Sequence, residues 1–233
     1  IFSELIKVRL RAQPNPSRVR RRELSRGINS EVVVMQTRTD DEVVAEEGEA
    51  EKGLVIERRF TTAGADPFDA FDWIEMSVEI RNPDGSLADE IHGVQLPSGF
   101  AGVPGKVCAQ KYLRKAGVPA ALRKVAEDGV PGWLQRSEPD HEKLQTLAPE
   151  DRFVGETDGR ELFRRLAGTW TYWGWNHGYF ASEADARAFY DEMAYLIASQ
   201  RSAPNSPQWF NTGLNWAYGI TGPAQGHHYV DAV

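Results

Sequence analysis

The stretch 202–213 constrains this chain most, because it places two prolines among small polar side chains directly after a long helical pattern. Pro204 and Pro207 cannot donate main-chain hydrogen bonds, and each favours an extended conformation in the residue before it. We therefore expect the helix to end here and Ser206 to lie on a stiffened turn, anchored by the aromatic pair at 209–210. Such a turn can carry a binding site on a rigid scaffold. It also fits a plain helix-to-strand connection whose Asn and Ser side chains cap backbone groups.

The overall composition fits a globular protein with a substantial core. The chain has 233 residues, of which 41% are hydrophobic, so it can form one large domain or two small ones. The net charge of −7 argues against a protein that generally coats nucleic acid. No apolar run approaches the roughly 18 to 20 residues that span a bilayer, so we expect no membrane association.

Cysteine and histidine usage limits the chemistry that the chain can perform. The single cysteine, Cys108, permits no intrachain disulfide and no cysteine-based metal site, which favours a reducing, cytoplasmic location. Cys108 lies in an apolar pattern without a nearby histidine, so we expect a buried side chain rather than a nucleophile. His227 and His228 would point to opposite faces of a strand, so we expect no metal site.

The composition of the chain changes near residue 54. Residues 1–30 are rich in arginine, and residues 40–51 are acidic with few large apolar groups. Such a composition buries too little surface to offset the entropy of ordering, so we expect a disordered tail over 1–53. The basic part also fits a nucleic-acid arm, which the overall acidity disfavours.

The next hundred residues predict a β-hairpin, one helix and an irregular excursion. Apolar residues alternate with mostly polar ones over 73–80 and recur over 87–96, on either side of an Asn-Pro-Asp-Gly turn. A helix is expected over 103–115, ended by Gly117. Prolines interrupt the pattern at 119–156, which we interpret as an insertion or surface excursion.

Two stronger helical patterns lie between the excursion at 119–156 and the stretch at 202–213. Apolar residues three and four apart predict a helix over 158–175, and Ser182 begins a capping-box pattern that opens a second helix toward residue 200. A strand-like run lies near the C-terminal end, at 227–231.

Three short motifs lie near the C-terminal end: NSPQWFNTGL (205–214), WAYGI (216–220) and GPAQGHHYVD (222–231). Four more lie upstream: RRFT (58–61), DPFD (66–69), QKYLRKAGVP (110–119) and GYF (178–180). In this order the motifs resemble those of adenosylcobalamin-dependent (class II) ribonucleotide reductases, and the three C-terminal ones are the most specific. The resemblance covers roughly residues 54–233 and is poorest in the 119–156 excursion.

The resemblance implies an α/β fold, a ten-stranded α/β barrel in the full protein. This fragment would be mainly α-helical, with a small N-terminal β-hairpin or meander and the first barrel strand. We accordingly divide it into the tail 1–53, a hairpin and helical region at 54–200, and the start of a truncated catalytic barrel at 201–233. A homodimer is a further possibility.

The resemblance also implies a function for the complete enzyme, which would convert ribonucleotides to 2′-deoxyribonucleotides by thiyl-radical chemistry. Homolysis of the cobalt–carbon bond of adenosylcobalamin starts this chemistry, and a thiol reductant such as thioredoxin completes it. The Ser or Thr before the proline of this turn contacts substrate phosphate in such reductases, a role that maps onto Ser206. Asn205 and Asn211 are weaker candidates for substrate binding.

The fragment contains no residue that matches a catalytic cysteine of these reductases, because Cys108 lies before the barrel. We therefore expect the fragment alone to be inactive and cobalamin to bind mainly to the missing barrel. The alternative is a stand-alone helical module whose aromatic faces bind a partner protein.

Overall fold

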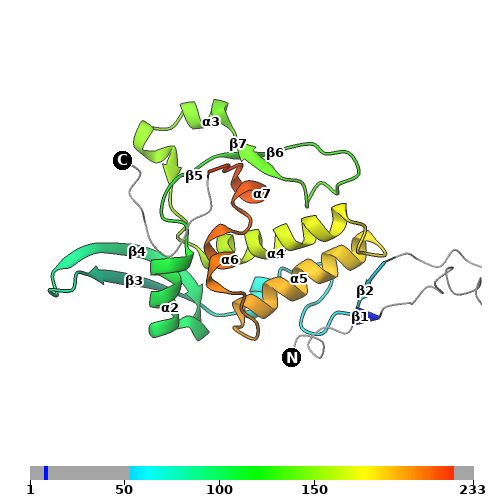
Figure 1. The fold of residues 1–233 in the computed structure, drawn as a ribbon, viewed down its shortest axis with the longest axis horizontal. Helices are drawn as coiled ribbons and strands as arrows, with labels where there is room; N and C mark the ends of the chain where they lie inside the picture. The colour runs from blue at the N-terminus through cyan, green and yellow to red at the C-terminus, as the bar shows by residue number, and fades with distance from the viewer. Residues whose placement is uncertain (1–7, 10–52, 223–233) are drawn as a thin grey trace, which may run out of the picture.

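The computed structural model describes residues 8–9 and 53–222 of the chain (Figure 1). The strands in this part are β1 (Val8–Arg9), β2 (Val55–Ile56), β3 (Trp73–Arg81), β4 (Leu87–Pro97), β5 (Val118–Pro119), β6 (Leu122–Lys124), β7 (Ser137–Pro139) and β8 (Phe153–Val154). The helices are α2 (Val103–Val107), α3 (His141–Gln145), α4 (Gly159–Asn176), α5 (Glu183–Ala198), α6 (Ser206–Asn211) and α7 (Leu214–Tyr218), with a π-helical turn η4 (Cys108–Tyr112) and short 3₁₀ turns η2 (Pro67–Ala70), η3 (Ser98–Phe100) and η5 (Pro149–Asp151). The chain is thus mixed, with helices and small sheets.

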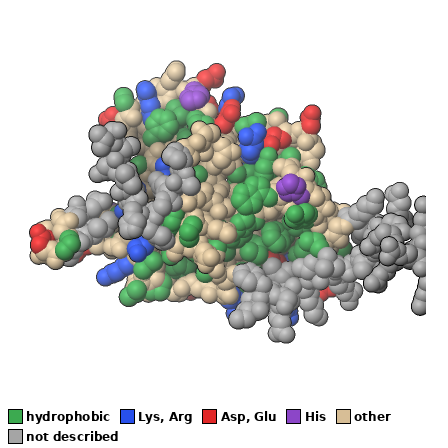
Figure 2. Space-filling model, viewed as in Figure 1, with side chains coloured by type: hydrophobic (Ala, Val, Ile, Leu, Met, Phe, Trp, Pro, Cys, Tyr) green, Lys and Arg blue, Asp and Glu red, His purple; other side chains and the backbone are tan. Residues whose placement is uncertain are grey.

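The predicted hairpin is confirmed by β3 and β4, which pair antiparallel. Its turn is held locally, because Asp84 accepts hydrogen bonds from the main-chain N–H and the hydroxyl of Ser86 at 2.9 and 2.6 Å. Val78 and Val94 are fully buried near the base of the hairpin. Figure 1 shows the turn end of the hairpin extending away from the helices, while its base packs on the core, and the space-filling view shows the same projection (Figure 2).

Helices α4 and α5 lie side by side and form the centre of the structure (Figure 1). Both begin at polar caps. Ser182, the predicted cap of α5, accepts the N–H of Asp185 at 3.2 Å, and at the start of α4 Asp158 and Glu161 form a capping box that we did not predict. The apolar stripe of α4 is buried in the main core through Leu162 and Leu166, as its helical spacing predicts.

The segment before the hairpin is fixed to α5 by carboxylates. The buried Glu192 accepts the N–H groups of Phe60 and Thr61, at 3.1 and 2.9 Å, and the Thr61 hydroxyl at 2.6 Å. Asp191 forms an ion pair with Arg58 at 2.7 Å. Residues 54–61 are therefore attached to the helical core by two acidic side chains of α5, Asp191 and Glu192.

The proline-rich segment 119–156 packs against α4 and α7. Leu134 and Leu144 are buried, and the Leu134 carbonyl accepts the indole N–H of Trp216 at 2.9 Å. Glu127 accepts the phenol of Tyr172 at 2.6 Å. The segment therefore contributes to the buried interior as well as to the surface.

One expectation about the chain differs from the structure, and two concern residues outside the part that the structure describes. The helix expected over 103–115 ends at Tyr112, because Leu113 adopts an extended conformation after the π-helical turn. No α-helix in the described part of the chain has the length and hydrophobicity needed to cross a membrane. The tail 1–53, except for β1 and Gly53, and the strand-like run at 227–231 lie outside the described residues.

Candidate functional site

Ser206 occupies the first position of the short helix α6, so the expected extended turn is wrong at this residue. Asn205 is the extended N-cap, with φ −61° and ψ 149°, and Pro207 follows within the first turn. Proline is tolerated there because the first N–H groups of a helix have no intrahelical acceptor. Ser206 is half-buried. The preceding helix α5 does end before this stretch, at Ala198, but Pro207 does not keep Ser206 extended, because it lies at the position where a helix accepts proline.

The Ser206 hydroxyl lies 3.2 Å from the phenol oxygen of Tyr112, which ends the π-helical turn η4. The Tyr112 ring stacks on Trp209 of α6, with centroids 5.2 Å apart and planes 12° from parallel. Trp209 and Phe210 are buried, which confirms that this aromatic pair anchors the segment. The hydroxyl is therefore supported by aromatic packing between two elements that are distant in sequence.

The three predicted site residues face different surroundings. Asn205 is exposed and its side chain makes no capping hydrogen bond. Asn211 lines a depression of about 280 Å³ beside α4, together with Trp173 and Trp216. Ser206 contacts η4 instead. The structure therefore gives Ser206 a defined polar partner and does not gather all three residues at one point.

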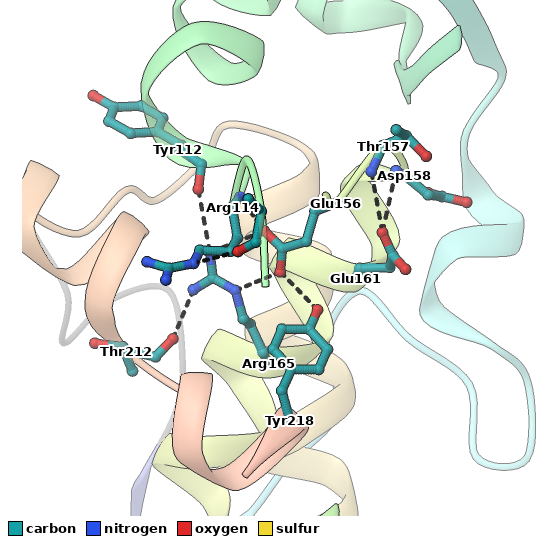
Figure 3. A network of polar contacts seen from close by, with 10 residues as sticks. Tyr112, Arg114, Glu156, Thr157, Asp158, Glu161, Arg165, Thr212 and Tyr218 are labelled. Atoms are coloured by element: carbon teal, nitrogen blue, oxygen red, sulfur yellow. Dashed lines mark hydrogen bonds and ion pairs between the residues drawn. The ribbon is translucent and has the colours of Figure 1, made fainter. Parts of the chain in front are cut away.

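A fully buried ion pair between Glu156 and Arg165 lies beneath this segment (Figure 3). The Arg165 Nε donates to Glu156 Oε1 at 2.7 Å, and Nη2 donates to Oε2 at 3.2 Å. The same carboxylate accepts the Tyr218 phenol and the main-chain N–H of Arg114, each at 2.7 Å. Burial and the Glu156 charge raise the pKa of the Tyr218 phenol. With these four hydrogen bonds, protein donors replace the water that an exposed Glu156 carboxylate would bind.

Arg165 also donates to two main-chain carbonyl groups, one in each of the segments that carry Ser206 and Tyr112. It donates to the Thr212 carbonyl at 2.6 Å and to the Tyr112 carbonyl at 3.2 Å (Figure 3). Thr212 follows α6 directly, and Tyr112 ends η4. One buried guanidinium thus links the two segments whose side chains meet at Ser206.

Sequence reasoning missed both members of this ion pair. Arg165 does carry a signal, because it lies three residues after Leu162 on the apolar face of α4. A charged residue on such a face is rarely buried unless it is paired. Glu156 had no comparable signal, because it was assigned to the end of the irregular excursion.

Cys108 is buried, as predicted. Burial, with a smaller contribution from the Glu156 charge, raises the pKa of its thiol to about 12. Among residues 53–222 no group of His, Cys, Asp and Glu side chains is arranged to hold a metal ion. We assign no described residue to a cobalt-containing cofactor.

Comparison with known proteins identifies the family. A family model described as class II vitamin B12-dependent ribonucleotide reductase matches residues 74–200, a range that runs through the proline-rich segment. The chain belongs to this reductase family. The match covers the hairpin, α4 and α5, and it ends just before the Ser206 segment.

Individual relatives agree with the family model. A vitamin B12-dependent ribonucleotide reductase of Bradyrhizobium diazoefficiens is 55% identical over 176 residues, which are 76% of this chain and 14% of the relative. The corresponding protein of Agrobacterium fabrum is 54% identical over the same shares, and that of Streptomyces avermitilis is 32% identical over 71% of this chain and 14% of its own length. The reductase chain described here thus spans about 14% of these relatives.

Proposed function

We propose that the chain is the N-terminal part of an enzyme that reduces ribonucleotides to 2′-deoxyribonucleotides by cobalamin-dependent thiyl-radical chemistry. The family match over residues 74–200 supports this proposal most directly, and it favours a reductase over a stand-alone helical module. Adenosylcobalamin supplies the radical when it is bound to such an enzyme. The single cysteine of this chain is buried with a raised pKa, so the proposal places the reactive thiols in another part of the enzyme.

Within this enzyme, the proposed contribution of the chain is substrate binding through Ser206. A hydroxyl can donate one hydrogen bond to a phosphate oxygen of the ribonucleotide. Ser206 is half-buried and held beside Tyr112, so little side-chain freedom would be lost when it binds. Asn205 and Asn211 are secondary candidates for the same contact. The proposal also includes a cytoplasmic location, which the single cysteine favours, and reduction by thioredoxin and a homodimer, which follow from the resemblance.

The substitution Ser206→Ala in the intact reductase tests this role. Loss of a hydrogen bond to a charged phosphate should weaken nucleotide binding by about 1 to 3 kcal/mol. Equilibrium binding of the ribonucleotide substrate measures this change directly. Ser202→Ala is the matched control, because it removes a half-buried serine hydroxyl four residues before Ser206, and it should leave the affinity unchanged. An unaltered affinity for the Ser206→Ala enzyme would reject the assignment.

A further inference from the structure

The contact between Ser206 and Tyr112 joins residues 94 positions apart, and its hydrogen-bond direction matters for any ligand of Ser206. Each hydroxyl has one proton to donate and can also accept. If Ser206 donated to Tyr112, it would have no proton left for a phosphate oxygen. If the more acidic phenol donates to Ser206, the serine proton is free to point away from Tyr112.

We propose that Tyr112 is a positioning residue for substrate binding, which donates to Ser206 Oγ and thereby directs the serine proton toward the substrate phosphate. This inference rests on the proposed phosphate contact of Ser206. Two hydrogen bonds in series polarise one another, so a phenol that donates to Ser206 also makes the serine a better donor to an anion. Tyr112 itself does not touch the nucleotide in this arrangement.

The surroundings of Tyr112 hold its phenol in place. Its ring is stacked almost parallel on Trp209, which is 6% exposed and lies three residues after Ser206. Its carbonyl accepts from Arg165, and the same guanidinium holds the Thr212 carbonyl at the far end of α6. Both sides of the Tyr112–Ser206 contact are therefore attached to one buried cation, which is paired with Glu156.

Because side-chain stacking and main-chain bonds hold the ring, the phenol oxygen can be removed without removing the support. Tyr112→Phe keeps the stack on Trp209 and keeps the carbonyl that accepts from Arg165. The variant should change only the hydrogen bond to Ser206. If Tyr112 had only a structural role, the effect of Tyr112→Phe on nucleotide binding would be the same with and without the Ser206 hydroxyl.

A double-mutant cycle in the intact reductase tests the inference. Dissociation constants for the ribonucleotide substrate, and for the corresponding nucleoside without phosphate, are measured for the parent, Tyr112→Phe, Ser206→Ala and the double variant. We expect Tyr112→Phe to weaken nucleotide binding about three- to tenfold, the effect of one hydrogen bond. In the Ser206→Ala background the same change should have no effect, and nucleoside binding should not respond in either background.

The outcomes separate this inference from the proposed function. If Ser206→Ala leaves nucleotide affinity unchanged, the phosphate contact itself is wrong. If Ser206→Ala weakens binding but Tyr112→Phe does not, the phosphate contact stands and the positioning role is overturned. An equal loss from Tyr112→Phe in both serine backgrounds, or an equal loss for the nucleoside, would also overturn it. Tyr179→Phe is the matched control, since Tyr179 is 57% exposed on the connection between α4 and α5.

Discussion

Replacing Glu156 by Gln should strongly destabilise the structure. The carboxylate is fully buried and accepts four hydrogen bonds, two from Arg165 and one each from Tyr218 and Arg114. An amide has one acceptor oxygen, so its NH₂ group would face donors, and the Arg165 charge would lose its partner. Breaking a buried ion pair from one side costs about 3 to 5 kcal/mol.

Urea unfolding of the 233-residue chain, followed by tryptophan fluorescence, measures this cost. With a slope of about 2 kcal/mol per molar urea, the unfolding midpoint should fall by roughly 1.5 to 2.5 M. Glu138→Gln is the control, because Glu138 pairs with Arg123 on the surface, and it should cost less than about 1 kcal/mol.

The coupling within the buried pair gives a second readout. The double variant Glu156→Gln/Arg165→Met removes the unpaired charge, so it should be less destabilised than the sum of the two single variants. A cost below about 1 kcal/mol for Glu156→Gln, or additive costs in the double variant, would refute the reasoning that this pair holds the segments together.

Further predictions concern two other buried groups, Cys108 and Glu192. Because burial raises the pKa of Cys108 to about 12, the folded chain should resist alkylation by iodoacetamide at pH 8, whereas the urea-unfolded chain should react; rapid labelling of the folded chain would contradict this. Only the unfolded chain ionises this thiol between pH 9 and pH 12, so its contribution to stability is present below pH 9 and is lost as the pH rises through that window. Glu192→Gln should weaken attachment of residues 54–61 by about 1.5 to 3 kcal/mol, seen as faster amide hydrogen exchange there than in α4; unchanged exchange would show that Glu192 is not the anchor.

Local patterns in the sequence predicted much of the secondary structure. Alternating apolar residues predicted the hairpin of β3 and β4, and helical spacing with the Ser182 cap predicted α5. These signals are local, because side-chain periodicity and capping depend on residues only a few positions apart. Pro207 was misjudged for a related reason: its effect depends on whether it lies inside a helix or in the first turn, and the sequence does not specify which.

The sequence by itself determined that the chain has a single cysteine, which we predicted to be buried. It also determined that a serine lies between two prolines in the stretch 202–213 and that this stretch resembles a reductase motif. Only the tertiary structure decided what supports that serine. Tyr112 reaches Ser206 across 94 residues, and Glu156 reaches Tyr218 across 62. Such contacts depend on how helices and turns pack together, which no short-range pattern encodes. The buried charge of Arg165 needs hydrogen-bond acceptors, and the tertiary packing decides which carboxylate and carbonyl groups lie beside it.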